Sequence, residues 1–533
     1  MEFFVKYMKI KKAKVWMLAI LSGLTLGCTG LDEEVFSEVT EDSFVPGESD
    51  IIALMASTYT PMRFVMDWQG YFDLQEESAD IIVTPTRPNG WDDGGVYKRM
   101  HWHKWDNLQW QPTNTWRSCY RGINSINRVI LQVESGLIPV DEQQATDIIN
   151  EMRGLRAFYY AILLDTHGNV PIITDYGDEL PVQHTRQQVF DFVEAELLEV
   201  IPFLTDVVGD VSYGRMTKYA AYHTLARIYL NAEVYTGTAQ WEKCINACNA
   251  IIDDGKFSLS PDYSDIFATN NDKNPEMVFA IPYDAIYAKQ WTAHMKMLLP
   301  DHRHVFGMET QPWGGSSCNP QFIDSYEEGD NRLQDTWLMG DQLNKNNGSV
   351  VMTLTKEMPS IEFCDATQGF RCGKYEIEEG ATGSLSNDFP FYRYTDVLMM
   401  KAECLLRTGR SAEAAQIVTD VRSRSFDDPD DAVVTGAELE GDTTMAYGTL
   451  DTEGNIDEAG DQSPVAYGRF LDELGWEFAC EARRRTDLIR FGVFQTKNWY
   501  NHKPQGDHTI IFPIGLEELN TNTNLDQNPG YIK

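Results

Sequence analysis

Basic side chains are scarce in this chain of 533 residues. Lys and Arg number 44 against 81 Asp and Glu, so the formal net charge is −37 at pH 7. Nucleic-acid binding depends on clustered cations that displace counterions from the phosphate backbone. DNA and RNA are therefore poor candidate ligands, and a neutral or cationic partner suits this charge best. Hydrophobic residues make up 42% of the chain, which excludes wholesale disorder.

Cysteine is also scarce, with nine in the whole chain, which is sparse for a disulfide scaffold of this size. Cys244 and Cys248 are one helical turn apart on an otherwise apolar face. This spacing favours core packing over a zinc site, which needs two more ligands at matching spacing. Cys364 and Cys372 flank a glycine-containing loop. In an exported protein they could form a disulfide, and the sequence leaves this open.

Long apolar runs are absent except near the amino terminus, where several lysines precede the run from Val15 to Leu26. That run is too short to span a bilayer and has the length of a signal-peptide core. It ends at Gly27-Cys28, which resembles a bacterial lipoprotein signal. We therefore expect residues 1–27 to be a lipoprotein signal peptide and Cys28 to be the lipidated residue. The alternative is a membrane-anchored or secreted chain with an incidental Cys28.

The rest of the chain has no stretch that approaches 18 apolar residues. We expect it to be held at the membrane by lipid alone.

Helical periodicity is strongest in the middle of the chain. Thr185 and Gln188 form a capping box at the start of one predicted helix. The four segments with this periodicity are residues 147–164, 185–204, 215–231 and 241–252.

Two predicted helix hairpins are separated by a long insertion. The first pairs residues 219–235 with 240–252 and carries small residues where the helices would touch, as in tetratricopeptide repeats. The second pairs residues 396–407 with a helix that Ser411 caps. We expect both hairpins to belong to one scaffold.

The block between the hairpins, residues 258–390, is rich in Gly, Asn, Pro and aromatic residues. It predicts irregular loops with minor sheet, including a short strand over residues 277–281. Residues 426–464 are acidic and lack apolar periodicity. Since their Gly and Glu are wrongly placed for an EF-hand, we expect a flexible surface insertion there.

Tryptophan is concentrated in one region. Trp91 lies in the stretch 86–95, which must be a loop. An indole on such a loop beside carboxylates suits a sugar, because the indole face packs on the C–H face of the ring while Asp accepts hydroxyl hydrogen bonds. The alternative is a tryptophan buried beneath the loop. The six tryptophans of this region are Trp68, Trp91, Trp102, Trp105, Trp110 and Trp116.

Catalytic motifs are few. The sequence has no His-Glu-x-x-His, no Gly-x-Ser-x-Gly and no phosphate-binding glycine loop. His101 with His103, and His302 with His304, could each share one face of a strand, but neither pair has a third ligand nearby. We therefore predict no metal and no cofactor. The many carboxylates neither exclude nor indicate the pair that glycoside hydrolysis requires.

In the order of its motifs the chain resembles the SusD/RagB family of outer-membrane lipoproteins of Bacteroidota. The matching pieces span nearly the whole sequence. Besides the lipoprotein start they are residues 116–123, 155–160, 168–171, 215–221, 393–396, 401–403, 477–481, 485–492, 512–514 and 527–531.

This resemblance implies a mainly α fold: a SusD-like tetratricopeptide-repeat helical scaffold with a loop-rich ligand-binding face and minor β. It implies one domain over residues 28–533, with an N-terminal part to about 255, a C-terminal part from about 256, and the acidic insertion at 426–464. Members are not enzymes. They capture glycan, or in some cases peptide, at the cell surface and form a lid on a SusC-like TonB-dependent transporter.

The resemblance also implies site residues. Trp91 is the expected stacking platform, with Asp73 as a hydroxyl acceptor. Arg485 and Asp487, in contrast, are expected to brace the scaffold. The remaining predicted ligand-binding residues are Asp92, Trp313, Tyr287 and Arg371.

The leading hypothesis is a non-catalytic glycan-binding lipoprotein of the cell surface. Peptide capture by the same architecture is the second hypothesis. A surface glycosidase and a purely structural helical-repeat adaptor are the alternatives from other classes.

Overall fold

Helices are the main regular structure of the computed structural model, which describes residues 48–88, 91–177 and 179–532. The expected signal peptide and Cys28 lie outside these residues. Residues Glu48–Lys533 form one compact unit. The mainly helical fold with minor β that the sequence predicts is confirmed.

The first helix pair is α5 (Trp110–Glu134) and α6 (Glu142–Thr166), which pack along their length. Gly122 of α5 allows this close approach, because a Cβ there would lie 2.3 Å from the Tyr159 ring of α6. The next helix, α7 (Arg186–Val200), begins with the capping box of Thr185 and Gln188 that the sequence predicts.

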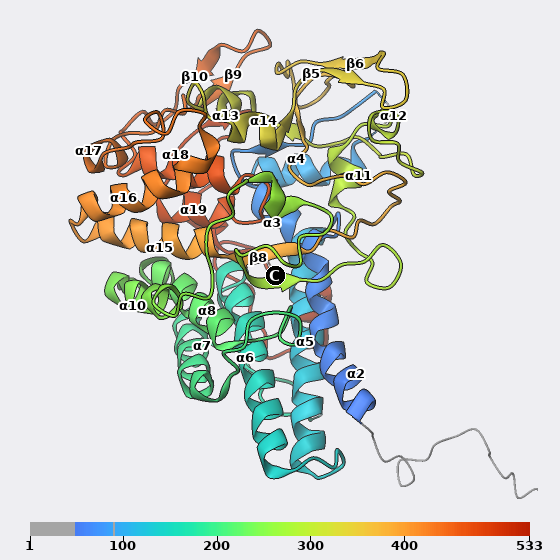
Figure 1. Cartoon of the computed structure of the whole chain (residues 1–533), viewed down its shortest axis with the longest axis vertical. Coiled ribbons are helices and arrows are strands. Elements are labelled where there is room, and N and C mark those ends of the chain that lie inside the picture. The colour runs from blue at the N-terminus through green and yellow to red at the C-terminus, as the bar shows by residue number, and fades with distance from the viewer. Residues whose placement is uncertain (1–47, 89–90, 178, 533) are drawn as a thin grey trace, which may run out of the picture. The chain divides into compact units, whose positions relative to one another are not determined.

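The second pair is α8 (Lys218–Leu230), which a short helix α9 (Ala232–Thr236) extends, and α10 (Trp241–Ile252). The third pair is α15 (Tyr394–Arg407) and α16 (Ser411–Arg422). Helix α10 packs directly on α15, as Figure 1 shows. The two predicted hairpins, far apart in sequence, therefore form one scaffold.

The expected cap at Ser411 is wrong. Ser411 is the first residue of α16, and Arg410 occupies the cap position without a side-chain hydrogen bond to the helix.

The loop-rich block carries short strands in small sheets, as predicted. The predicted strand over residues 277–281 is β2 (Met277–Ile281), and it pairs antiparallel with β8 (Phe389–Arg393). The other pairs in this region are β1 (Ile82–Val83) with β3 (Ser317–Cys318), β4 (Trp337–Leu338) with β7 (Arg371–Cys372), and β5 (Gly340–Leu343) with β6 (Val350–Leu354).

Shorter helices complete the described fold, and most of them are labelled in Figure 1. They are α2 (Glu48–Tyr59), α3 (Tyr71–Glu76), α4 (Val96–His101), α11 (Ala293–Met297), α12 (His302–Phe306), α13 (Pro320–Asp324), α14 (Arg332–Thr336), α18 (Gly468–Phe478), α19 (Arg484–Arg490) and α20 (Leu516–Thr521).

The acidic insertion is more ordered than expected. It contains α17 (Gly436–Leu439) and strands β9 (Gly448–Leu450) and β10 (Ile456–Glu458), and β9 also pairs with β11 (Trp499–Tyr500). Tyr447 is buried and donates a hydrogen bond of 3.0 Å to Asp80. Aperiodic buried residues such as Leu439 and Met445 anchor the segment, so a period-based analysis does not detect them.

The eight cysteines in the described residues are all free and buried. Cys244 and Cys248 pack in the core beside Cys404, as predicted. Cys364 and Cys372 do not form a disulfide. The Cys372 thiol lies beside Cys480 instead, while the Cys364 thiol donates to the Ser360 carbonyl at 3.0 Å.

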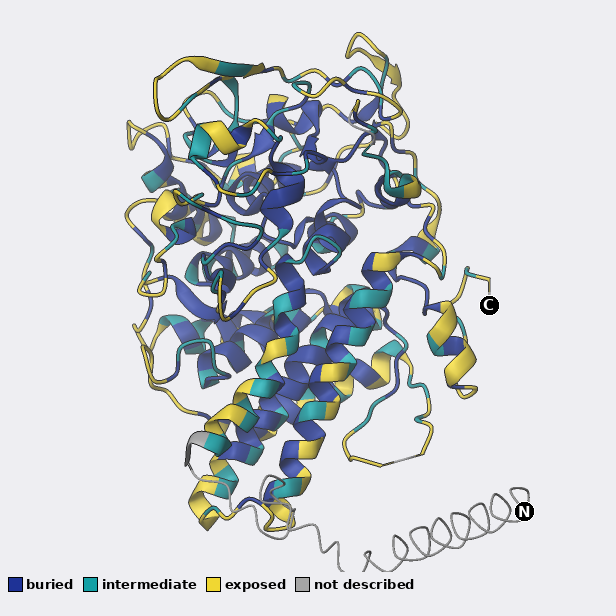
Figure 2. Ribbon diagram, turned by 90° about the vertical axis from the view of Figure 1, so that its right-hand side faces the viewer, coloured by how far each residue is buried: buried dark blue, intermediate teal, exposed yellow. Residues whose placement is uncertain are grey.

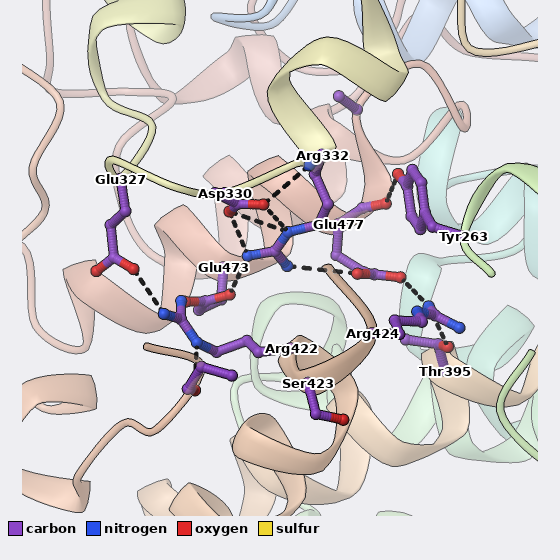
Figure 3. Close-up of polar contacts among 12 residues, drawn as sticks. Tyr263, Glu327, Asp330, Arg332, Thr395, Arg422, Ser423, Arg424, Glu473 and Glu477 are labelled. Carbon is purple, nitrogen blue, oxygen red and sulfur yellow. Dashed lines mark hydrogen bonds and ion pairs between the residues drawn. The ribbon is translucent and has the colours of Figure 1, made fainter. Parts of the chain in front are cut away.

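A buried ionic network ties the loop-rich block to the later helices (Figure 3). Glu477 of α18 pairs with Arg332 at 3.3 Å, Arg393 at 2.9 Å and Arg424 at 2.6 Å. Glu473, one turn earlier, pairs with Arg332 at 2.9 Å. The surrounding cations hold the pKa of Glu477 well below its usual range against the opposing effect of burial.

Arg485 and Asp487 belong to the scaffold, as expected. Both are buried in α19. Arg485 donates to the Ile510 carbonyl at 2.6 Å, and Asp487 pairs with Arg490 at 2.7 Å.

Buried residues follow the inner faces of the helix pairs and exposed residues follow their outer turns, as Figure 2 shows. In the described part of the chain, no helix has the length and apolar character needed to cross a membrane.

Candidate ligand-binding site

Five aromatic rings follow one another across the loop-rich region, and we call them the aromatic array. Trp91 lies near-parallel to Tyr97, with ring centroids 6.0 Å apart, and near-parallel to Trp313 at 6.3 Å. Trp68 meets Trp313 edge to face at 5.7 Å and Trp110 at 6.2 Å. Tyr97 is buried, Trp91, Trp313 and Trp68 are half-buried, and Trp110 is 38% exposed. The array thus runs from the interior to the surface.

The loop that carries Trp91 is closed at its base. The Arg87 N–H donates to the Trp91 carbonyl at 3.1 Å. Asp92 accepts a hydrogen bond of 2.7 Å from the Thr86 hydroxyl and pairs with Lys98 at 2.9 Å. These hydrogen bonds lower the pKa of Asp92, so its carboxylate stays ionised.

Three consecutive residues after Asp92 adopt left-handed backbone angles. Asp93, Gly94 and Gly95 have φ values of 44°, 63° and 74°. The two glycines adopt these angles without strain, but Asp93 adopts its angle at a cost in backbone conformational energy. Strain of this kind concentrates at ligand sites and fixes where the side chain points.

Asp93 is the carboxylate of this loop that remains available. Its half-buried side chain has no hydrogen bond or ion pair with another described residue. Partial burial and the neighbouring Asp92 raise its pKa. A carboxylate in this situation gains by accepting a hydrogen bond from a ligand hydroxyl.

The loop that carries Trp313 is fixed to α11. The Trp313 N–H donates to the Met295 carbonyl at 2.7 Å, and the Gly315 N–H donates to the Lys296 carbonyl at 2.8 Å. Gly315 lies against Trp91, since a Cβ on Gly315 would fall 2.8 Å from the indole. The two tryptophan loops are therefore packed on one another.

Arg371 lies beneath these loops and is fully buried. It donates to the carbonyls of Gly315 and Ala366, the first at 3.3 Å and the second at 2.7 Å. The nearby Arg87, also buried, donates to the carbonyls of Asp365 and Gln368 at 2.7 and 2.9 Å. Burial and the adjacent Arg87 lower the pKa of Arg371. In this geometry Arg371 positions loops and does not reach the surface.

Asp73 is likewise fully buried. It forms an ion pair with Lys296, which also pairs with Glu77 at 2.6 Å. The Lys296 ammonium lies 4.6 Å from the centroid of the Tyr97 ring, the buried end of the array. Burial raises the pKa of Asp73 to about 7 although Lys296 opposes it. Asp73 thus fixes the position of Lys296, which in turn supports the Tyr97 ring of the array.

The structure brings together Trp91, Trp313 and Asp92 among the predicted residues, with Asp73 and Arg371 below them. Tyr287 is 88% exposed, and no ring contact joins it to the array within the described chain. The sequence prediction left out Trp68, Trp110 and Asp93 as site residues. The concentration of tryptophans over residues 68–116 was the signal for the first two.

A metal site has no support in the described ranges, where no group of three or more His, Cys, Asp or Glu has suitable geometry. Neither histidine pair lies on a strand, which was the arrangement in which the two imidazoles could have shared one face. His302 and His304 lie on helix α12, where a spacing of two directs side chains apart. His101 ends α4, and His103 follows it with a left-handed φ of 53°.

Comparison with known proteins gives consistent matches. The family model described as the SusD family matches residues 253–531, and one described as starch-binding associating with outer membrane matches residues 36–230. The chain is 23% identical to a SusD-like protein of Formosa agariphila over 97% of each chain. It is 23% identical to the starch-binding protein SusD of Bacteroides thetaiotaomicron over 72% of each.

Solved structures share the fold. A SusD superfamily protein from Parabacteroides distasonis has a TM-score of 0.70 at 18% identity, covering 92% of this chain and 100% of that chain. A laminarin-binding SusD-like protein has a TM-score of 0.67 at 19% identity, covering 91% and 100%.

Proposed function

This chain belongs to the SusD family, and from that premise we propose that it is a non-catalytic glycan-binding protein of the cell surface. The observation that carries the proposal is the aromatic array, in which Trp91 and Trp313 lie on loops that are packed together. The named relatives that bind starch or laminarin support the same ligand class.

The chemistry of the array suits a sugar. The flat faces of half-buried indoles offer apolar area to the C–H face of a pyranose, and ordering rigid rings on binding costs little entropy. Asp92 and Asp93 lie directly after Trp91 and supply carboxylate oxygens for hydroxyl groups. Asp93 is the stronger candidate acceptor, because Asp92 already pairs with Lys98 and Thr86.

Affinity electrophoresis against neutral polysaccharides, starch and laminarin included, tests the proposal, with calorimetry on whichever polymer retards the protein. Trp91→Ala should weaken binding by more than about tenfold, since a stacked aromatic anchor contributes roughly 2–4 kcal/mol. The matched control is Trp241→Ala, which removes a half-buried tryptophan of α10 outside the array. Undiminished binding by Trp91→Ala would reject the site.

The proposal also covers the protein's location in the cell and its partner protein. Lipidation at Cys28 would anchor the protein in the outer membrane, where it would form a lid on a SusC-like TonB-dependent transporter and deliver glycan for import. The outer-membrane wording of the matched family description supports this. The Cys28→Ser variant should not be labelled when cells are grown with labelled palmitate. The variant protein should also be lost from the membrane fraction. Pull-down of the wild-type protein should recover a TonB-dependent barrel.

Peptide capture is the second candidate, and the net charge of −37 favours it for basic peptides. Salt-sensitive binding of a Lys-rich peptide, without retardation by any glycan, would select it. A glycosidase would instead release reducing ends during long incubation with the bound polymer, and we expect none.

A further inference from the structure

We propose that the glycan site continues past Trp110 along helix α5 into two adjoining hollows, so that its ligand is a long, uncharged glycan chain rather than a short oligosaccharide. This inference rests on the proposed function and specifies its substrate class. Three features carry it: one polar and aromatic stripe on α5, the two hollows beside that stripe, and the charge balance of the ridge between them.

The stripe follows from helical spacing. Trp110, Asn114, Arg117 and Asn124 recur at intervals of four, three and seven residues, which places them on one face of α5. The fourteen residue steps from Trp110 to Asn124 span roughly 21 Å at 1.5 Å per step. Trp110 is also the exposed end of the aromatic array, so the stripe begins where the array ends.

The first hollow has a volume of about 270 Å³ and is open to the surface beside Trp110. Carboxamides line it: Gln69 and Asn107 from the preceding loops, and Asn114 from the stripe. The Asn114 amide donates to Gln69 at 3.3 Å, which holds both side chains at the wall. Carboxamides offer a donor and an acceptor side by side, as sugar hydroxyls require.

Arg117 forms the ridge between the hollows and lines both. It pairs with Glu517 at 2.5 Å and with Glu518 at 2.6 Å. Both acids belong to α20, the short helix near the C-terminus that Figure 2 shows largely exposed. The ridge thus presents two carboxylates to one guanidinium. Such a surface repels a polyanionic polymer and accepts a neutral one.

The second hollow is larger, about 570 Å³, and lies between α5, α20 and the segment around residue 176. Tyr120 and Tyr176 supply aromatic surface, and Tyr176 is 58% exposed. Asn124 supplies an exposed carboxamide, while the buried Asn522 donates to the Pro181 carbonyl at 2.8 Å and so fixes the wall of the hollow. An exposed tyrosine beside amides repeats the chemistry of the first hollow, which is what successive sugars of one chain require.

The test is a length series measured by calorimetry. Starch and laminarin, each as polymer and as its oligosaccharide ladder, are titrated into the wild-type chain. If affinity electrophoresis identifies another neutral polymer that binds, the oligosaccharides from its partial hydrolysis are titrated in the same way. Affinity should rise at least about tenfold from the trisaccharide to the longest chains, since each added stacking contact strengthens binding. Tyr176→Ala and Trp110→Ala should lose this gain, and Tyr176→Ala should bind the trisaccharide unchanged.

Phe203→Ala is the control, because Phe203 is 55% exposed but lines neither hollow. A flat length series, a gain that survives in Tyr176→Ala, or preferred binding of a sulfated polymer would overturn the inference. Failure of the wild-type chain to bind any neutral glycan would instead overturn the proposed function, so the two failures are distinguishable.

Discussion

Gly315 lies so close to Trp91 that a methyl group on Gly315 would sit 2.8 Å from the Cε2 and Nε1 atoms of the indole. Real side chains do not approach this closely, so glycine at this position is what allows the two tryptophan loops to pack together. The relationship makes the position of Trp91 depend on a residue that offers no side chain to a ligand.

Gly315→Ala should therefore displace Trp91 and weaken glycan binding about tenfold, and it should lower the stability by about 1–3 kcal/mol because Gly315 is buried. Calorimetry with the bound polymer measures the first effect and chemical denaturation the second. Gly383→Ala is the control, since a Cβ there meets nothing within 4 Å. Equal affinities in the two variants would show that Trp91 does not need this contact.

Lys296→Met should destabilise the protein by about 3–5 kcal/mol, because it leaves buried Asp73 and Glu77 without their shared cation. Urea denaturation checks the size of the change. The variant should also bind glycan more weakly than its remaining folded fraction explains, since Lys296 supports Tyr97 under the array. Lys345→Met removes an exposed ion pair and should cost less than about 1 kcal/mol.

Glu477→Gln should destabilise the chain by a similar amount, about 3–5 kcal/mol, because three arginines lose the charge they share. Differential scanning calorimetry should show a clearly lower Tm. Glu242→Gln serves for comparison, since it removes an exposed pair with Arg410. If both variants unfold at the wild-type temperature, the network in Figure 3 does not hold the loop-rich block in place.

The buried histidines should make a contribution to stability that is lost as the pH falls below about 6.5, whereas buried Asp73, whose pKa is raised, contributes in the opposite sense. Burial lowers the pKa of His101 to about 3 and that of His502 well below its usual range. Below about pH 6.5 the unfolded chain binds protons at these histidines, whereas the native chain does not. Each such group therefore lowers the free energy of unfolding by about 1.4 kcal/mol for every unit by which the pH is lowered. This contribution is fully present above pH 6.5 and is lost progressively toward pH 3.

Denaturation midpoints measured from pH 7.5 to 4.5, in the wild type and in histidine variants, should separate the histidine contribution from that of the buried carboxyl groups. His101→Phe removes one such group while keeping the ring contacts with Tyr500 and His502, so its slope should be smaller. His304→Gln, at an exposed position, should keep the wild-type slope. Identical slopes in all three proteins would contradict the assignment to buried imidazoles.

Local patterns were enough to predict part of the fold. The helix α7 and its capping box at Thr185, the strand β2 and the two helix hairpins depend on near-neighbour periodicity, which the sequence displays directly. Helix α5 was missed as a helix. Its buried face includes Gly122, where a Cβ would meet the Tyr159 ring, and small or polar residues such as Thr115 and Ser118 that interrupt the apolar stripe in its first half.

The chain by itself therefore determined two of its helix pairs, its acidic charge, its tryptophan-rich loops and its resemblance to a family, because each is a property of composition or of short spacing. Tertiary packing alone decided which of these residues face a ligand. It buried Asp73 with Lys296 and Arg371 among carbonyl groups, left Asp93 available, and aligned Trp91 with Trp313, more than two hundred residues away in sequence. Burial and pairing depend on which distant segments meet, and no local pattern records that.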